Sequence, residues 1–159
     1  CCWSNGERKS ESSCPARSCS WPVVAMADGE SVIVDCPESD NFKLTADKLE
    51  KAITDKTKAI MPVHLTGRVC EMDPIIALAK KYSLAVIEDA AQSFLVNNHE
   101  HKFCGTKYDI GCFSLSITKL INMVYGGFCV TNSYKFFRKL ILLSIVVLGS
   151  KEMRGSCSG

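Results

Sequence analysis

One stretch in the middle of the chain carries two apolar runs separated by an amphipathic one. The apolar runs Lys58 to Leu65 (KAIMPVHL) and Leu84 to Glu88 (LAVIE) are each predicted as a strand. Between them, Met72 to Tyr82 is predicted as a helix, with Asp73 as its cap and Pro74 at its first position. A strand, a helix and a strand of this length form a right-handed crossover, so the two strands should lie parallel in a sheet covered on both faces.

The flanking segments extend this pattern. Ser31 to Asp35 (SVIVD) is predicted as a strand, and Thr45 is placed to cap a helix over ADKLEKAI. Further strands are expected at Ile110 to Ser114 (IGCFS) and Phe128 to Thr131 (FCVT), and Asn132 could cap a last helix through SYKFFRKLILL. The expected fold class is therefore α/β, with a mostly parallel sheet flanked by helices.

Charge and hydropathy disfavour two classes of partner. The chain has 19 basic and 17 acidic residues and no basic stripe, so neither nucleic-acid binding nor membrane binding is expected. The apolar run Leu140 to Leu148 is far shorter than the roughly 20 residues that cross a bilayer. It is predicted as a buried helix or strand, or, if the rest of its domain is absent, as an exposed segment prone to aggregation.

Cysteine usage suggests a reducing compartment. The 10 cysteines are scattered and the chain does not open with a targeting signal, so a cytoplasmic location is predicted, with most thiols acting as small buried hydrophobes. Cys1, Cys2, Cys14 and Cys19 cluster without a usual zinc spacing, so no metal is predicted. Residues 1 to 22 are predicted as a disordered or non-family tail.

Two charged residues lie where an α/β protein could carry chemistry. Asp89 follows a predicted strand end, where open α/β sheets bind ligands; alternatively it caps the next helix, holds a ribose or binds magnesium. Lys119 lies in an almost uncharged stretch before a Gly-Gly turn. Burial disfavours an ammonium ion and frees the amine to attack a carbonyl, as a Schiff base requires. Alternatively, this lysine extends from a half-buried turn into solvent.

Several short motifs occur in a fixed order around these two residues. They are Pro62 to Gly67 (PVHLTG), Glu88 to Gln92 (EDAAQ), Asp109 to Ser114 (DIGCFS), Lys119 five residues after that serine, the Gly126 and Gly127 pair, and Val130 to Asn132 (VTN). The ordered set resembles the DegT/DnrJ/StrS family of sugar aminotransferases, which have the fold-type-I arrangement of pyridoxal-phosphate enzymes. The resemblance covers about Val23 to Leu143. It implies that residues 23 to 148 are part of a cofactor-binding large domain truncated at both ends, followed by a flexible tail over residues 149 to 159.

The resemblance also implies roles for four residues. Lys119 would bind pyridoxal 5'-phosphate covalently and carry a proton between the substrate's α-carbon and C4′ of the cofactor. Asp89 would pair with the pyridine nitrogen, Gln92 would contact the phenolic oxygen, and Ser114 would donate a hydrogen bond to the phosphate. The implied reaction moves an amino group from glutamate to a keto group of a nucleotide-linked deoxysugar, in a homodimer. Related dehydratases have histidine at the lysine position, so Lys119 favours transamination.

Departures from the family pattern leave other hypotheses open. Residues 1 to 22 show no counterpart of the Gly-Thr pair that holds the phosphate at a helix N-terminus, and Tyr125 replaces a commonly acidic residue before the Gly-Gly pair. The chain could therefore be an inactive truncated remnant that acts as an interaction partner of a full-length relative. A nucleotide-binding module is disfavoured because no Gly-rich loop follows a predicted strand. His64 is predicted as a packed core residue, and His99 and His101 receive no catalytic role.

Overall fold

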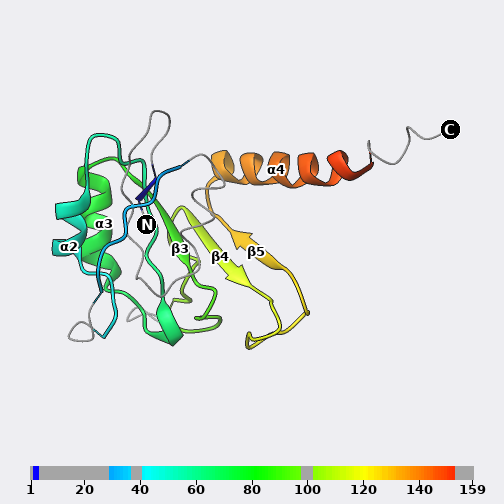
Figure 1. Ribbon diagram of the computed structural model, residues 1–159, viewed down its shortest axis with the longest axis horizontal. Coiled ribbons are helices and arrows are strands. Elements are labelled where there is room, and N and C mark those ends of the chain that lie inside the picture. The colour runs from blue at the N-terminus through cyan, green and yellow to red at the C-terminus, as the bar shows by residue number, and fades with distance from the viewer. Residues whose placement is uncertain (1, 4–28, 37–40, 98–101, 153–159) are drawn as a thin grey trace.

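The computed structural model describes residues 2–3, 29–36, 41–97 and 102–152 (Figure 1). The elements in chain order are β1 (Cys2–Trp3), α2 (Ala46–Ala52), β2 (Ala59–Ile60), the short 3-10 helix η2 (Leu65–Gly67), α3 (Met72–Lys81), β3 (Ala85–Asp89), β4 (Ile110–Ser114), β5 (Gly127–Val130) and α4 (Tyr134–Glu152). The strands form one sheet in the order β1-β2-β3-β4-β5. The sequence pattern did not predict β1, which lies in the stretch interpreted as a tail.

The sheet has a parallel centre with an antiparallel strand at each edge (Figure 1). β2, β3 and β4 run parallel, while β1 pairs antiparallel with β2 and β5 pairs antiparallel with β4. The chain passes from β2 to β3 through α3, so the predicted strand, helix and strand unit is confirmed. The α/β fold class is confirmed with it.

The core lies between the sheet and the helix pair α2 and α3. Leu49 of α2, Ile75 of α3 and Val86 of β3 belong to one buried cluster. Along β3 the side chains alternate: Val86 and Glu88 are buried, whereas Ile87 between them is only half-buried. Helices α2 and α3 pack against each other on one face of the sheet, and Ile87, which points to the other face, is half-buried. Coverage of both faces stays a prediction.

Three predicted elements differ from those observed. Residues 31 to 35 form no strand; instead Val34 packs into the core cluster from an irregular segment. The strand expected from Lys58 shortens to β2, since Pro62 has no amide proton for a ladder hydrogen bond. Helix α3 begins at Met72, as predicted, but its N-cap is Glu71 and not Asp73. Asp73 lies in the first turn, where the helix dipole favours an acid.

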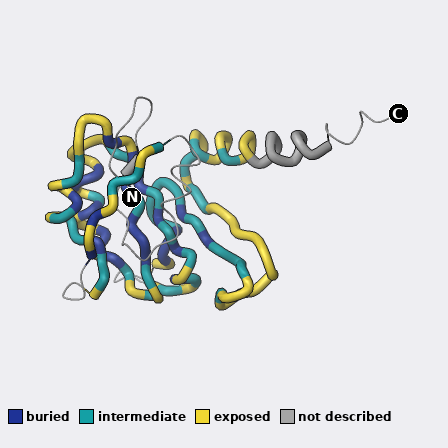
Figure 2. The backbone as a smooth tube through the Cα atoms, viewed as in Figure 1, coloured by how far each residue is buried: buried dark blue, intermediate teal, exposed yellow. Residues whose placement is uncertain are grey.

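Helix α4 extends away from the sheet (Figure 1). In its first turn the Phe137 amide donates a hydrogen bond to the Ser133 carbonyl. Asn132, the predicted cap, does not cap the helix, because its side chain donates to the Thr106 carbonyl. Leu142 and Leu143 are exposed (Figure 2), so the described part of the apolar run is not buried and matches the alternative of an exposed segment. The predicted boundary after residue 148 falls inside α4.

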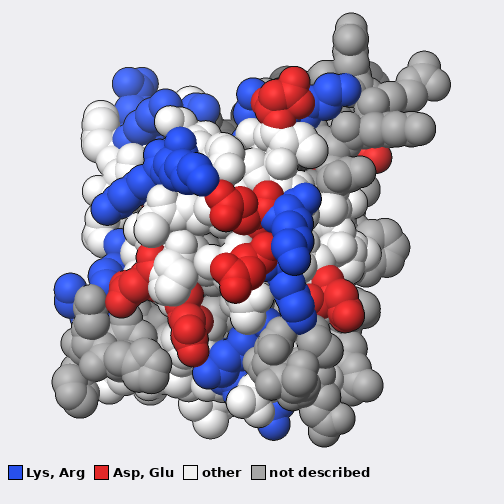
Figure 3. All heavy atoms as spheres, turned by 90° about the vertical axis from the view of Figure 1, so that its left-hand side faces the viewer, with Lys and Arg blue, Asp and Glu red and all other residues white. Residues whose placement is uncertain are grey.

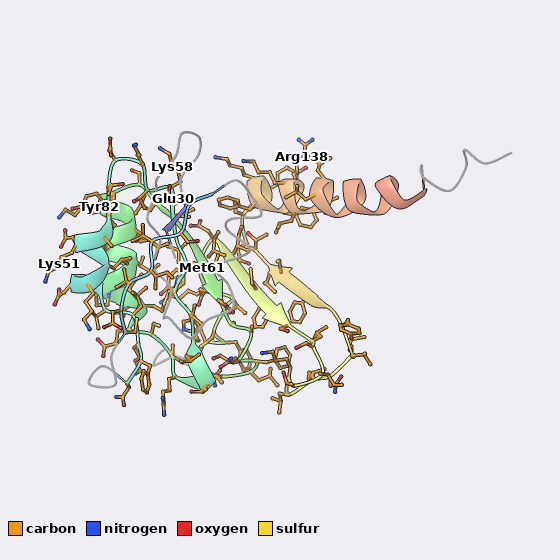
Figure 4. All side chains as sticks on the ribbon, in the orientation of Figure 1. Glu30, Lys51, Lys58, Met61, Tyr82 and Arg138 are labelled. Atoms are coloured by element: carbon orange, nitrogen blue, oxygen red, sulfur yellow. The ribbon has the colours of Figure 1, made fainter. Side chains whose placement is uncertain are left out.

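Two further observations concern the surface. Within the described ranges, no helix combines the length and apolar character needed to cross a bilayer. The face formed by α2 and α3 carries basic and acidic side chains interspersed with one another (Figure 3). Lys51 and Tyr82 lie at its outer edge (Figure 4), where Tyr82 and Lys81 both donate hydrogen bonds to the Glu50 carboxylate.

Candidate active site

Asp89 and Ser114 lie at the same edge and on the same face of the sheet. Asp89 is the last residue of β3 and is aligned with Cys112 of the parallel strand β4. Side chains alternate along a strand, so Ser114, two residues beyond Cys112 and the last residue of β4, points to the same face as Asp89. The carboxylate and the hydroxyl therefore lie at the carboxyl ends of neighbouring parallel strands, where α/β sheets bind ligands.

The backbone of Asp89 is held by the segment that follows β2. Its amide donates to the Pro62 carbonyl at 2.9 Å, and its carbonyl accepts the His64 amide at 3.0 Å. Its carboxylate Oδ1 accepts the amide of Ala91 at 3.1 Å. A turn rather than a helix follows, so the helix-capping alternative is wrong, and the carboxylate instead stabilises a tight local turn.

Lys119 lies in the loop of residues 115 to 126, which joins β4 to β5. Its amide donates to the Ser116 carbonyl at 2.9 Å, and the loop is closed at its base where the Leu115 amide donates to Gly126 at 2.9 Å. The side chain is half-buried, and its amine makes no hydrogen bond or ion pair with another described residue. Its apolar neighbours are exposed (Figure 2), as shown by Leu120 at 79%. The amine is therefore open to a carbonyl compound.

Gln92 and Ser114 already make local hydrogen bonds. Gln92 Oε1 accepts the amide of Thr66 at 2.9 Å and so holds η2, where Thr66 has a left-handed φ of 52°. The amide nitrogen of Gln92 is the group suited to an anionic oxygen, because it is a donor. Ser114 Oγ donates to Ser116 Oγ at 3.3 Å, a long bond that a stronger acceptor could replace.

A buried pair joins the PVHLTG and EDAAQ motifs beneath the candidate site. His64 is fully buried, and its Nδ1 accepts the Cys70 amide at 3.3 Å. The proton of the neutral ring is then on Nε2, which donates to Glu88 Oε2 at 3.1 Å. The prediction of His64 as a hydrogen-bonded core residue is confirmed; His99 and His101 lie outside the described residues. Sequence reasoning had not recognised that Glu88 is buried.

Glu88 also positions the loop before β4. Its Oε2 accepts the amide of Gly105 at 3.0 Å, and Gly105 in turn packs against Gly111 of β4. The carboxylate therefore connects three segments that are distant in sequence. The one signal that could have revealed it is an acid at an inward position of an apolar strand, because a buried charge requires partners.

Other candidate sites are weaker. In the part of the chain that the structure describes, no group of three or more His, Cys, Asp or Glu side chains could hold a metal ion. An apolar groove between β5 and α4 is lined by Phe128, Phe137 and Ile141 among others, but by neither Asp89 nor Lys119. That groove therefore does not include the two charged residues of the candidate site.

Comparison with known proteins identifies the family. Residues 18–157 match the model of the DegT/DnrJ/EryC1/StrS aminotransferase family. The chain belongs to this family. The match is wider than the stretch from Val23 to Leu143 that carries the motifs. Aminotransferases of this family depend on pyridoxal phosphate.

Individual relatives agree with this assignment. The chain is 43% identical over 120 residues to the GDP-perosamine synthase of Caulobacter vibrioides, which covers 76% of this chain and 32% of that protein. It is 41% identical over 106 residues to the GDP-perosamine synthase of Escherichia coli O157:H7, covering 65% and 29%. The solved structure of S. venezuelae DesV superposes with a TM-score of 0.75 at 30% identity, covering 82% of this chain and 36% of DesV. The chain thus spans about a third of the length of the curated relatives it matches.

The groups at the sheet edge fit the family's cofactor. A pyridoxal aldehyde requires an amine, its ring nitrogen requires an acid, and its phosphate requires hydrogen-bond donors. Lys119 offers an amine without a described partner, Asp89 a carboxylate, and Ser114 a hydroxyl on the same face as that carboxylate. The chemistry of this donor set matches the three needs.

Proposed function

We propose that the protein to which this chain belongs transfers an amino group, with glutamate as donor, to the keto group of a nucleotide-linked deoxysugar. The family match and the two GDP-perosamine synthases support an amino-sugar product. The observation that carries the proposal is the shared edge of Asp89 and Ser114 beside the loop of Lys119. A homodimer and a cytoplasmic location stay predictions, as do the domain limits at residues 23 and 148.

Each polar group would have its own role. Bound pyridoxal phosphate supplies an aromatic ring that accepts electrons from a deprotonated carbon. The Lys119 amine would hold the cofactor at its carbonyl carbon and would take up the proton from the substrate's α-carbon. The Asp89 carboxylate holds a proton on the pyridine nitrogen by its negative charge. The Gln92 amide donates to the phenolic oxygen, and the Ser114 hydroxyl donates to the phosphate.

A second candidate function rests on exposed apolar surface. In the loop around Lys119, Ile117, Met123 and Tyr125 are 66%, 64% and 87% exposed. Surface of this kind usually marks an interaction site. The alternative is therefore an inactive remnant that binds a full-length relative through this loop.

Cofactor labelling separates the two functions. The purified chain is titrated with pyridoxal phosphate, the visible absorption band is recorded, and the product is reduced with borohydride and mapped by mass spectrometry. Saturable modification at Lys119 is expected. The affinity should be weak, because each charged hydrogen bond to the phosphate that this chain does not supply costs about 1.5 to 3 kcal/mol. Label spread evenly over exposed lysines such as Lys56 and Lys135 would rule out a cofactor site in this chain.

The variant Asp89→Asn tests the acidic partner of the ring. Asparagine keeps a side-chain oxygen for the Ala91 amide, so the turn after β3 should persist while the negative charge is lost. Loss of a charged hydrogen bond is worth about 1.5 to 3 kcal/mol, so cofactor affinity should fall roughly 10- to 100-fold. The absorption titration measures this change. Unchanged affinity and an unchanged band would show that Asp89 does not contact the ring.

A further inference from the structure

Two cysteines face each other across the antiparallel strands β4 and β5. Cys112 and Cys129 are register partners, and their sulfur atoms lie 3.8 Å apart. The Leu115 amide donates to Gly126, so that pair is hydrogen-bonded, and pairs alternate along the ladder. Cys112 and Cys129 therefore occupy a non-hydrogen-bonded pair, where Cα atoms are about 4.5 Å apart. That separation falls within the roughly 4.4 to 6.8 Å spanned by disulfides.

These two thiols differ from the other described ones. Cys36, Cys70 and Cys104 are buried, as the sequence predicted for most cysteines. Cys112 is only half-buried, and Cys129, on the edge strand β5, is exposed. An oxidant in solution can therefore reach the pair, while the buried thiols are protected.

The local electrostatics give the two sulfurs different reactivity. The hydrogen bond from Cys112 lowers the pKa of the Cys129 thiol to about 7, against the opposing effect of desolvation by neighbouring atoms. That same hydrogen bond, together with burial and the nearby charges of Cys129 and Asp89, raises the pKa of Cys112. Cys129 is thus the thiolate near neutral pH, and Cys112 is the protonated partner beside it.

We propose that Cys112 and Cys129 are a redox modification site that closes to a reversible cross-strand disulfide. Hydrogen peroxide is the oxidant. The Cys129 thiolate attacks one peroxide oxygen, forming an S–O bond while the O–O bond breaks; the departing hydroxide takes from solvent the proton that the Cys129 thiol had released, and leaves as water. The Cys112 thiol then attacks the Cys129 sulfur; the S–S bond forms, the S–O bond breaks, and the departing hydroxide takes the Cys112 proton as a second water. Two thiols are oxidised, and one peroxide is reduced to two waters.

The disulfide would form beside the candidate active site. Cys112 is aligned with Asp89 on the neighbouring strand, so the two side chains share a face of the sheet. The linked strands also carry both ends of the loop that contains Lys119. Oxidation would fix the base of this loop, and the proposal does not depend on cofactor binding.

The test uses the full chain, first reduced and then treated with graded hydrogen peroxide. After blocking of free thiols and digestion without reductant, we expect one dominant cross-linked peptide pair joining Cys112 to Cys129, lighter by two hydrogen atoms and separated by dithiothreitol. Cys129→Ser should remove this link, whereas Cys70→Ser, which changes a buried thiol, should leave it. Circular dichroism of each variant establishes that the fold is retained.

Two outcomes would overturn the proposal. The first is recovery of Cys112 and Cys129 as separate blocked or sulfinic peptides from protein with an intact fold. The second is links spread over the 10 cysteines to the same extent in native and urea-unfolded protein, since strand pairing would then have no influence.

Discussion

Replacement of Lys119 by alanine is expected to abolish site-specific cofactor attachment. Lys119 is the only lysine in the loop that joins β4 to β5. Its replacement should therefore remove all of the borohydride-trapped label from this loop. In the whole protein the same change would also remove the group that moves the proton, which is worth about 100- to 10,000-fold in rate. Absorption spectra and peptide mapping measure the first effect, and single-turnover amino transfer measures the second.

The fold should survive this substitution. The Lys119 side chain makes no hydrogen bond with another described residue, so the free energy of unfolding should change by less than about 0.5 kcal/mol. Lys135→Ala, on the exposed start of α4, is the matched control and should keep the label at Lys119. If Lys119→Ala retained the same visible band and the same saturable label, the amine would lie elsewhere and the assignment would be withdrawn.

The variant Gly111→Ala is expected to destabilise the fold strongly. A Cβ on this residue of β4 would lie 1.7 Å from the carbonyl oxygen of Gly105 and 2.5 Å from its carbonyl carbon. These are backbone atoms, and Gly105 is held by its hydrogen bond to Glu88, so neither can rotate aside. We expect a loss of about 3 kcal/mol or more in the free energy of unfolding, or roughly 10 °C in Tm.

Urea and thermal unfolding, followed by circular dichroism, measure this loss. Cys129→Ala is the control, because it changes an exposed side chain in the adjacent strand and should shift stability by less than about 0.5 kcal/mol. Equal stability of Gly111→Ala and the wild type would mean that the Gly105 segment can move away from β4. The buried arrangement around Glu88 would then be looser than the structure indicates.

The elements that sequence predicted well share a local cause. β4 was predicted with its observed bounds, and α3 within one residue at its C-terminus, because each has a clear apolar period and clear ends. The strand predicted for residues 31 to 35 is not observed, because an apolar β-branched run can pack into a core without a strand partner. The predicted site residues followed from motif order, and the structure brings Asp89 and Ser114 to one edge through strand register.

The sequence alone determined the parallel crossover, the family and the identity of the polar residues at the strand ends. These depend on the order and spacing of neighbouring residues, which the chain carries directly. Only the tertiary structure decided that His64 pairs with Glu88, that Gly111 must lack a side chain, and that Cys112 meets Cys129. Each of these contacts joins segments separated by a loop or a helix. The register and packing that align them arise only when the sheet assembles, because a shift of one residue would turn every side chain to the opposite face.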